Sequence, residues 1–134
     1  MGQAFAQRLS GFGVNVLAYD KYKRDYSNAY AREASMDELY EQADILSLHV
    51  PLTEETQFLV DEAYLARFSK NTFLINTARG KVVRMSDLVN ALKSGKVRGA
   101  ALDVLENEKL HQLTPEQQQT FHQLRQSDRV LFTL

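Results

Sequence analysis

Short apolar runs alternate along the chain with stretches in which apolar residues recur at helical spacing. The apolar runs predict β-strands at residues 14–19, 44–50, 72–76, 99–105 and 129–134. The helical spacing predicts helices at residues 3–10, 35–42, 61–68 and 86–94, and a last helix that opens at residue 114. Alternating strands and helices are typical of repeated βαβ units and a parallel sheet. We therefore predict an α/β fold with a doubly wound parallel sheet, and we treat residues 1–134 as one domain.

Local signals mark where these elements begin and end. Gly11-Phe12-Gly13 follows the first helix, and glycine favours the left-handed conformation that ends helices. Ser35 is followed three residues later by Glu38, the spacing of a capping box. Pro51 ends the second strand because it cannot donate to a ladder, and Pro115 suits the first position of the last helix.

The two ends of the chain predict a unit that extends beyond residues 1–134. The first helix leaves no room for a preceding strand, and the last strand stops without a turn. In the doubly wound order 3-2-1-4-5-6, the central first strand would then precede Met1. We expect its absence to separate the strand at residues 14–19 from the strand at residues 44–50, and to leave unpaired strand edges.

Composition excludes several classes of protein. There are 16 Lys and Arg against 17 Asp and Glu, a formal net charge of -1, so we expect no nucleic-acid partner and no basic membrane-binding surface. The chain has no Cys, which excludes disulfides, a thiolate zinc site and a cysteine nucleophile. No cluster of histidines and carboxylates predicts a metal site. No apolar run approaches the roughly 18 residues of a membrane span, so we expect a soluble, cytoplasmic protein.

Candidate chemistry follows the predicted strands, because ligands of doubly wound sheets bind at the carboxyl ends of the strands. The residues concerned are Asp20, His49 to Pro51, Asn76 to Gly80, and Asp103 to Glu108. Since parallel strands end at one edge, these residues are expected to share it.

Two of these side chains suggest a ligand. Asp20 lies 18 residues after Gly2, close to the spacing at which a carboxylate accepts hydrogen bonds from the adenosine ribose of a dinucleotide. Its alternative role is that of a turn former. Arg79 places a planar charged group at the end of a strand, suited to a carboxylate; the alternative is a surface arginine before a glycine turn.

The remaining candidates for proton transfer are less specific. Glu106 and Glu108 could orient a basic group or act as acid–base partners, or they could belong to a solvated acidic loop. His49 lies within a strand pattern, whereas His111 and His122 lie in a polar segment. None of the three histidines stands out as a proton donor.

Four sequence blocks together cover nearly the whole chain. They are GQAFAQRLSGFGVNVLAYD at residues 2–20, ADILSLHVPLT at 43–53, INTARG at 75–80 and GAALDVLENE at 99–108. In this order and spacing they resemble the D-isomer-specific 2-hydroxyacid dehydrogenases, a family that includes D-3-phosphoglycerate, D-lactate, glycerate and formate dehydrogenases. The resemblance implies a Rossmann-like fold.

The resemblance also implies NAD as the cofactor. Backbone at Met1 and Gly2 would lie near the pyrophosphate, and Asp20 would bind the adenosine ribose and repel a 2′-phosphate, although Lys21, Lys23 and Arg24 follow it closely. Asp103 would contact the nicotinamide amide. The full set of cofactor-binding positions that the resemblance implies is Met1, Gly2, Asp20, Val50, Pro51, Thr56, Thr77, Ala78, Arg79 and Asp103.

Two further positions match the family's catalytic groups. Arg79 matches the arginine that holds the carboxylate and carbonyl of the substrate, and Glu108 matches the glutamate that hydrogen-bonds the catalytic histidine and raises its proton affinity. Lys109 stands where the family usually has proline. The histidine itself belongs to a T-P-H sequence that in the family follows the last strand, so we expect it beyond Leu134.

These matches imply hydride transfer between NAD and a D-2-hydroxy or 2-oxo acid, with 3-phosphoglycerate-like acids among the candidate substrates. We expect residues 1–134 to be part of the NAD-binding domain, with the substrate-binding domain outside this chain. We expect the intact protein to be active as a homodimer formed through the cofactor domain, and the isolated chain to be inactive. The alternatives are an NAD-sensing, non-catalytic interaction module of the corepressor type, and a structural fragment without function.

Overall fold

The computed structural model describes residues 1–133, which form alternating strands and helices. The helices are α1 (Gly2–Arg8), α2 (Met36–Gln42), α3 (Glu62–Ala66), α4 (Met85–Ser94) and α5 (Pro115–Gln126), with the short 3-10 helices η1 (Leu9–Phe12), η2 (Gly80–Val82) and η3 (Leu110–Gln112). The strands are β1 (Leu17–Ala18), β2 (Arg32–Glu33), β3 (Ile45–Leu48), β4 (Thr72–Asn76), β5 (Val97–Leu102) and β6 (Val130–Phe132). The last residue of the predicted final strand, Leu134, lies outside the described residues.

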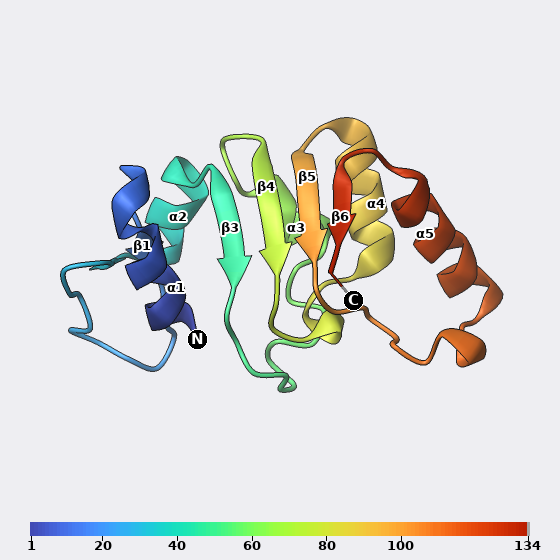
Figure 1. The fold of residues 1–134 in the computed structure, drawn as a ribbon, viewed down its shortest axis with the longest axis horizontal. Helices are drawn as coiled ribbons and strands as arrows, with labels where there is room; N and C mark the ends of the chain where they lie inside the picture. The colour runs from blue at the N-terminus through green and yellow to red at the C-terminus, as the bar shows by residue number, and fades with distance from the viewer. Residues whose placement is uncertain (134) are drawn as a thin grey trace.

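The strands form two parallel sheets, as Figure 1 shows. The larger has the order β3-β4-β5-β6, and the smaller pairs β1 with β2. Helices connect consecutive strands of the larger sheet, so the predicted α/β class with a parallel sheet is confirmed. Within residues 1–133 no ladder joins β1 to β3, which is the separation that the sequence predicts.

One face of the larger sheet forms the hydrophobic core. Alternate residues such as Leu46, Leu74 and Leu102 are buried in one cluster with Phe68 of the segment after α3 and Leu88 of α4. This alternation is the period of two that strands impose on side chains. On the opposite face, the apolar side chains of Ile45, Phe73 and Leu131 are exposed.

Several predicted boundaries were wrong, and one strand was missed. The strand predicted at residues 14–19 is only Leu17–Ala18, and the strand predicted at 99–105 begins and ends earlier, at Val97–Leu102. β2 was not predicted because Arg32 and Glu33 show no apolar alternation. It forms because the N–H groups of Arg32 and Ala34 donate to the carbonyls of Val16, just before β1, and Ala18, in β1. β2 is therefore determined by its hydrogen bonds to the neighbouring strand, and the pattern of its side chains does not indicate a strand.

The predicted helix signals are confirmed. Ser35 and Glu38 form a capping box at α2, and Thr114 and Gln117 form another at α5, with Pro115 at the first position. Gly13 has a φ of 68° at the end of η1. None of the helices in residues 1–133 has the length and apolar character needed to cross a membrane.

Candidate functional site

The carboxyl ends of the parallel strands meet at one edge of the molecule. In Figure 1 the arrowheads of β3, β4 and β5 point to this edge, and the amino end of α1 lies beside it. The residues that follow β3, β4 and β5 therefore approach one region of the surface, and the hydrogen bond of Lys21 to Glu55 brings the segment after β1 to the same region. This arrangement is where doubly wound sheets bind their ligands.

The amino end of α1 packs against His49, at the end of β3. A Cβ at Gly2 would lie 3.4 Å from the Cβ and Cγ of His49, and the rings of Phe5 and His49 have centroids 5.6 Å apart. Partial burial lowers the pKa of His49, and its Nε2 lies 2.9 Å from the Ser47 hydroxyl. His49 therefore packs α1 against the end of β3.

Asp20 has the turn-forming role that the sequence left open. Its Oδ1 accepts hydrogen bonds from the backbone N–H groups of Tyr22, at 2.9 Å, and Lys23, at 3.2 Å. Its own N–H donates to the hydroxyl of Tyr26, at 2.8 Å. Among the hydrogen bonds of residues 1–133, this carboxylate engages only Oδ1. The turn thus fixes the carboxylate and leaves Oδ2 available to a ligand.

The loop after β3 is held by its own threonines. The Thr56 hydroxyl donates to the Pro51 carbonyl, at 2.6 Å, and accepts from the Thr53 N–H, at 2.8 Å. Val50 is half-buried against the core, and Pro51 is exposed. The hydrogen bonds of Thr56 thus fix the conformation of this loop, including the backbone at Pro51 and Thr53.

The loop after β4 presents Arg79. Asn76 is fully buried, and its side chain accepts from the Ala78 N–H, at 3.0 Å, and donates to the Arg79 carbonyl, at 3.1 Å. A Cβ at Gly80 would lie 1.6 Å from the Leu105 carbonyl oxygen, so only glycine fits there. Arg79 is exposed, and one of its Nη1 hydrogens is donated to the Ala78 carbonyl, at 2.7 Å.

Asp103, which follows β5, is fixed by the ends of β4 and β6. Its N–H donates to the Asn76 carbonyl, at 3.0 Å, and its Oδ1 accepts from the Thr133 hydroxyl, at 2.6 Å. The Asp103 side chain is exposed at the same edge. Thr77, half-buried, and Ala78, buried, lie next to it along the edge, after β4.

The two glutamates after β5 have different surroundings. Glu106 accepts a hydrogen bond from the Met85 N–H, at 2.9 Å, and so caps α4, a structural role that the sequence did not suggest. Glu108 is exposed, and in the described part of the chain its carboxylate has no hydrogen-bond partner. His111 and His122 are exposed on η3 and α5.

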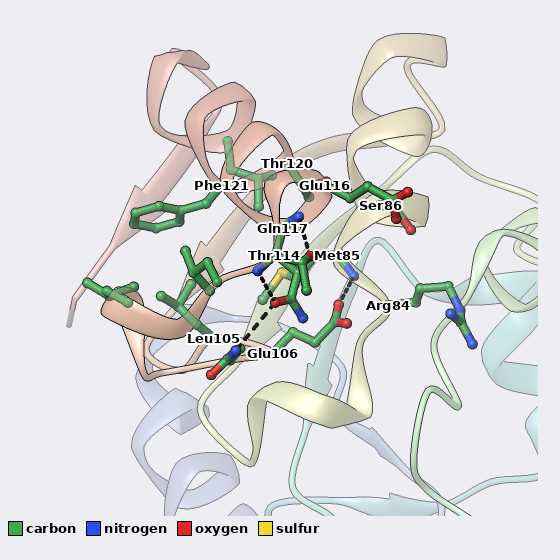
Figure 2. A pocket seen from close by; sticks show the side chains of 14 residues that line it. Arg84, Met85, Ser86, Leu105, Glu106, Thr114, Glu116, Gln117, Thr120 and Phe121 are labelled. Carbon is green, nitrogen blue, oxygen red and sulfur yellow. Dashed lines mark hydrogen bonds between the residues drawn. The ribbon is translucent and has the colours of Figure 1, made fainter.

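A separate cavity of about 230 Å³ lies between the start of α4, the loop after β5 and α5, as Figure 2 shows. Met85, Glu106, Gln117 and Phe121 are among its lining residues. Hydrogen bonds within the wall engage Glu106 and Gln117. The lining includes none of the positions that the resemblance assigns to the cofactor or to catalysis. No group of metal-ligating side chains occurs among residues 1–133.

A parallel sheet with connecting helices and a fixed carboxylate after β1 is typical of the class of doubly wound nucleotide-binding domains. The chain belongs to the D-isomer specific 2-hydroxyacid dehydrogenase, NAD binding domain family, whose model matches residues 1–133. This confirms the family that the four sequence blocks indicate. The domain that this family model describes binds NAD.

The names of individual similar proteins agree with this family. A D-specific alpha-keto acid dehydrogenase from Enterococcus faecalis is 47% identical over 111 residues, covering 81% of this chain and 32% of the relative. A glyoxylate reductase from Thermofilum pendens is 48% identical over 120 residues, covering 85% of this chain and 35% of the relative. The crystal structure of a D-lactate dehydrogenase from Aquifex aeolicus, complexed with NAD and lactic acid, superposes with a TM-score of 0.87 at 34% identity, covering 98% of this chain and 42% of that chain.

The chain therefore spans about a third of the length of the curated relatives it matches. These relatives are dehydrogenases and reductases, and they give no support to the alternative of a corepressor-type module.

Proposed function

We propose that the chain is the NAD-binding part of an oxidoreductase that transfers a hydride between NAD and a D-2-hydroxy or 2-oxo acid. The observation that carries this proposal is the loop of Asn76, Arg79 and Gly80, which holds an exposed guanidinium at the edge where β4 ends. The reported relatives act on D-lactate, glyoxylate and alpha-keto acids according to their names, and these compounds share a carboxylate beside the reacting carbon.

In this proposal the cofactor lies along the carboxyl edge. Backbone at Met1 and Gly2 approaches the pyrophosphate, and the free Oδ2 of Asp20 accepts from the adenosine ribose. Asp103, fixed by Thr133, accepts from the nicotinamide amide. The residues that line the path between these points are Val50, Pro51, Thr56, Thr77, Ala78 and Arg79. Bound NAD supplies the two-electron chemistry by taking up or releasing a hydride.

Arg79 binds the substrate carboxylate and carbonyl oxygen. Its guanidinium offers five N–H donors in a planar fork, and only one hydrogen bond of this fork is to protein among the described residues. The remaining donors face solvent and match a carboxylate. The same cation polarises the carbonyl when a 2-oxo acid is reduced.

Glu108 orients an acid–base histidine that another part of the protein supplies. A carboxylate next to an imidazolium raises its proton affinity, because the opposite charge favours the protonated form. The exposed carboxylate of Glu108, which has no hydrogen-bond partner among the described residues, is suited to this role.

We also propose that a substrate-binding domain lies outside residues 1–134, that the isolated chain has no turnover, and that the protein forms a homodimer through the cofactor domain. The exposed apolar side chains of the outer sheet face favour association. The lack of cysteine favours a cytoplasmic setting.

Replacing Arg79 with Ala in the full protein tests this function. We expect kcat/KM for 2-oxo acids to fall by at least about 100-fold, because a charge-assisted pair with the substrate is lost in the transition state. The Kd for NADH, measured by calorimetry, should rise by far less than kcat/KM falls. Arg8→Ala is the matched control, because this exposed arginine lies in the last turn of α1, at the end opposite to Gly2. Equal losses of turnover and of NADH affinity would contradict the assignment.

A further inference from the structure

Glu55 joins the two loops that flank the proposed ribose position. Its Oε1 lies 2.9 Å from Nζ of Lys21, and its Oε2 accepts a hydrogen bond from the hydroxyl of Tyr22. These partners lie 34 and 33 residues earlier in the chain, directly after Asp20. The contacts thus connect the turn after β1 to the loop after β3.

The segment that Glu55 holds is basic and lies next to the carboxylate of Asp20. Lys21, Lys23 and Arg24 follow Asp20 within four residues. Arg24 donates to the carbonyl of Lys23, at 3.0 Å. Lys21 is the cation next in sequence to Asp20, and its ammonium is turned to Glu55. The hydrogen bond raises the pKa of Lys21, and the hydrogen bonds from Tyr22 and then Lys21 lower the pKa of Glu55.

A cation beside the ribose would reverse the effect of Asp20. A carboxylate there accepts from the 2′-hydroxyl of NAD and repels the 2′-phosphate of NADP, whereas a basic side chain accommodates that phosphate. The ion pair with Glu55 compensates the charge of Lys21 and holds its ammonium group at Glu55. The Glu55 carboxylate also adds negative charge to this end of the site.

We propose that Glu55 is a specificity-determining residue, which holds Lys21 away from the adenosine ribose and so preserves the preference for NAD over NADP. This inference rests on the proposed position of the ribose at Asp20. It explains why the chain tolerates a lysine directly after the carboxylate that selects NAD.

Glu55→Gln in the full protein tests the inference by calorimetry with NADH and NADPH. We expect the ratio of the two Kd values to shift toward NADPH by roughly fivefold, the size of an exposed ion contact. The shift should shrink at high salt because such contacts are screened. Retained NADH binding shows that the variant is folded. Glu54→Gln is the matched control, because Glu54 is also exposed and neighbours Glu55 but forms no ion pair within residues 1–133.

Lys21→Gln, alone and combined with Glu55→Gln, shows whether Lys21 transmits the effect. We expect the double variant to lose most of the gain in NADPH affinity, since no lysine is then released. An unchanged ratio in Glu55→Gln, an equal shift in Glu54→Gln, or a full gain in the double variant would overturn the inference.

Asp20→Ala separates this inference from the proposed function on which it rests. Loss of discrimination in Asp20→Ala with none in Glu55→Gln overturns only the role of Glu55. No change in Asp20→Ala overturns the position of the ribose and the role of Glu55 together.

Discussion

At the scale of single residues, the site depends on side chains that touch no ligand. The sequence predicted Arg79 as a candidate from its place after a strand, but it did not predict that the buried Asn76 amide spans the loop. An asparagine at a strand end is equally typical of a simple turn. Likewise, position 80 requires glycine because of the Leu105 carbonyl, 25 residues further along the chain. The residues around Gly80 in the sequence do not indicate this contact.

Gly80→Ala tests the close packing of this loop. The added Cβ would meet the Leu105 carbonyl at 1.6 Å, and backbone on both sides must move. We expect the free energy of unfolding, from urea denaturation, to fall by about 3 kcal/mol. Gly11→Ala is the control, because a Cβ at Gly11 would meet nothing within 4 Å. A wild-type denaturation midpoint for Gly80→Ala would show that the loop is not packed in this way.

At the scale of elements, the signals at helix ends were predictable because they are local. Ser35 and Glu38 form the cap that their spacing indicates, and Pro115 occupies the first position of α5 as expected. Signals that depend on another part of the chain were not predictable, such as the strand β2 and the carboxylate of Glu106 at the start of α4. The sequence therefore suggested an acid–base role for a residue that caps a helix.

Glu106→Ala tests this cap. The Met85 N–H at the start of α4 would lose its acceptor, so we expect the free energy of unfolding to fall by about 1 kcal/mol. Glu41→Ala, at an exposed position of α2, should change it by less than about 0.5 kcal/mol. Thermal unfolding of both variants measures the difference. A Glu106→Ala variant as stable as Glu41→Ala would contradict the role of the cap.

At the scale of the whole molecule, the alternation of strands and helices was enough to predict the parallel sheet and the edge at which candidate residues meet. The separation of β1 from β3 also followed from the strand order. The contact of Glu55 with Lys21 and Tyr22 was not predictable, since it joins two polar loops by exposed side chains that carry no apolar pattern. Contacts between exposed polar loops are therefore the least predictable from the sequence, and the proposed control of cofactor preference by Glu55 depends on such a contact.

The central claim is that NAD binds along the carboxyl edge of the sheet. Amide hydrogen exchange of the full protein, with and without saturating NAD, tests it most directly. We expect slower exchange in residues 18–23, 49–57, 76–80 and 103 when NAD is bound, and no change in residues 113–124 beside the cavity of Figure 2. Unchanged exchange along the edge, or protection confined to the cavity between α4 and α5, would contradict it.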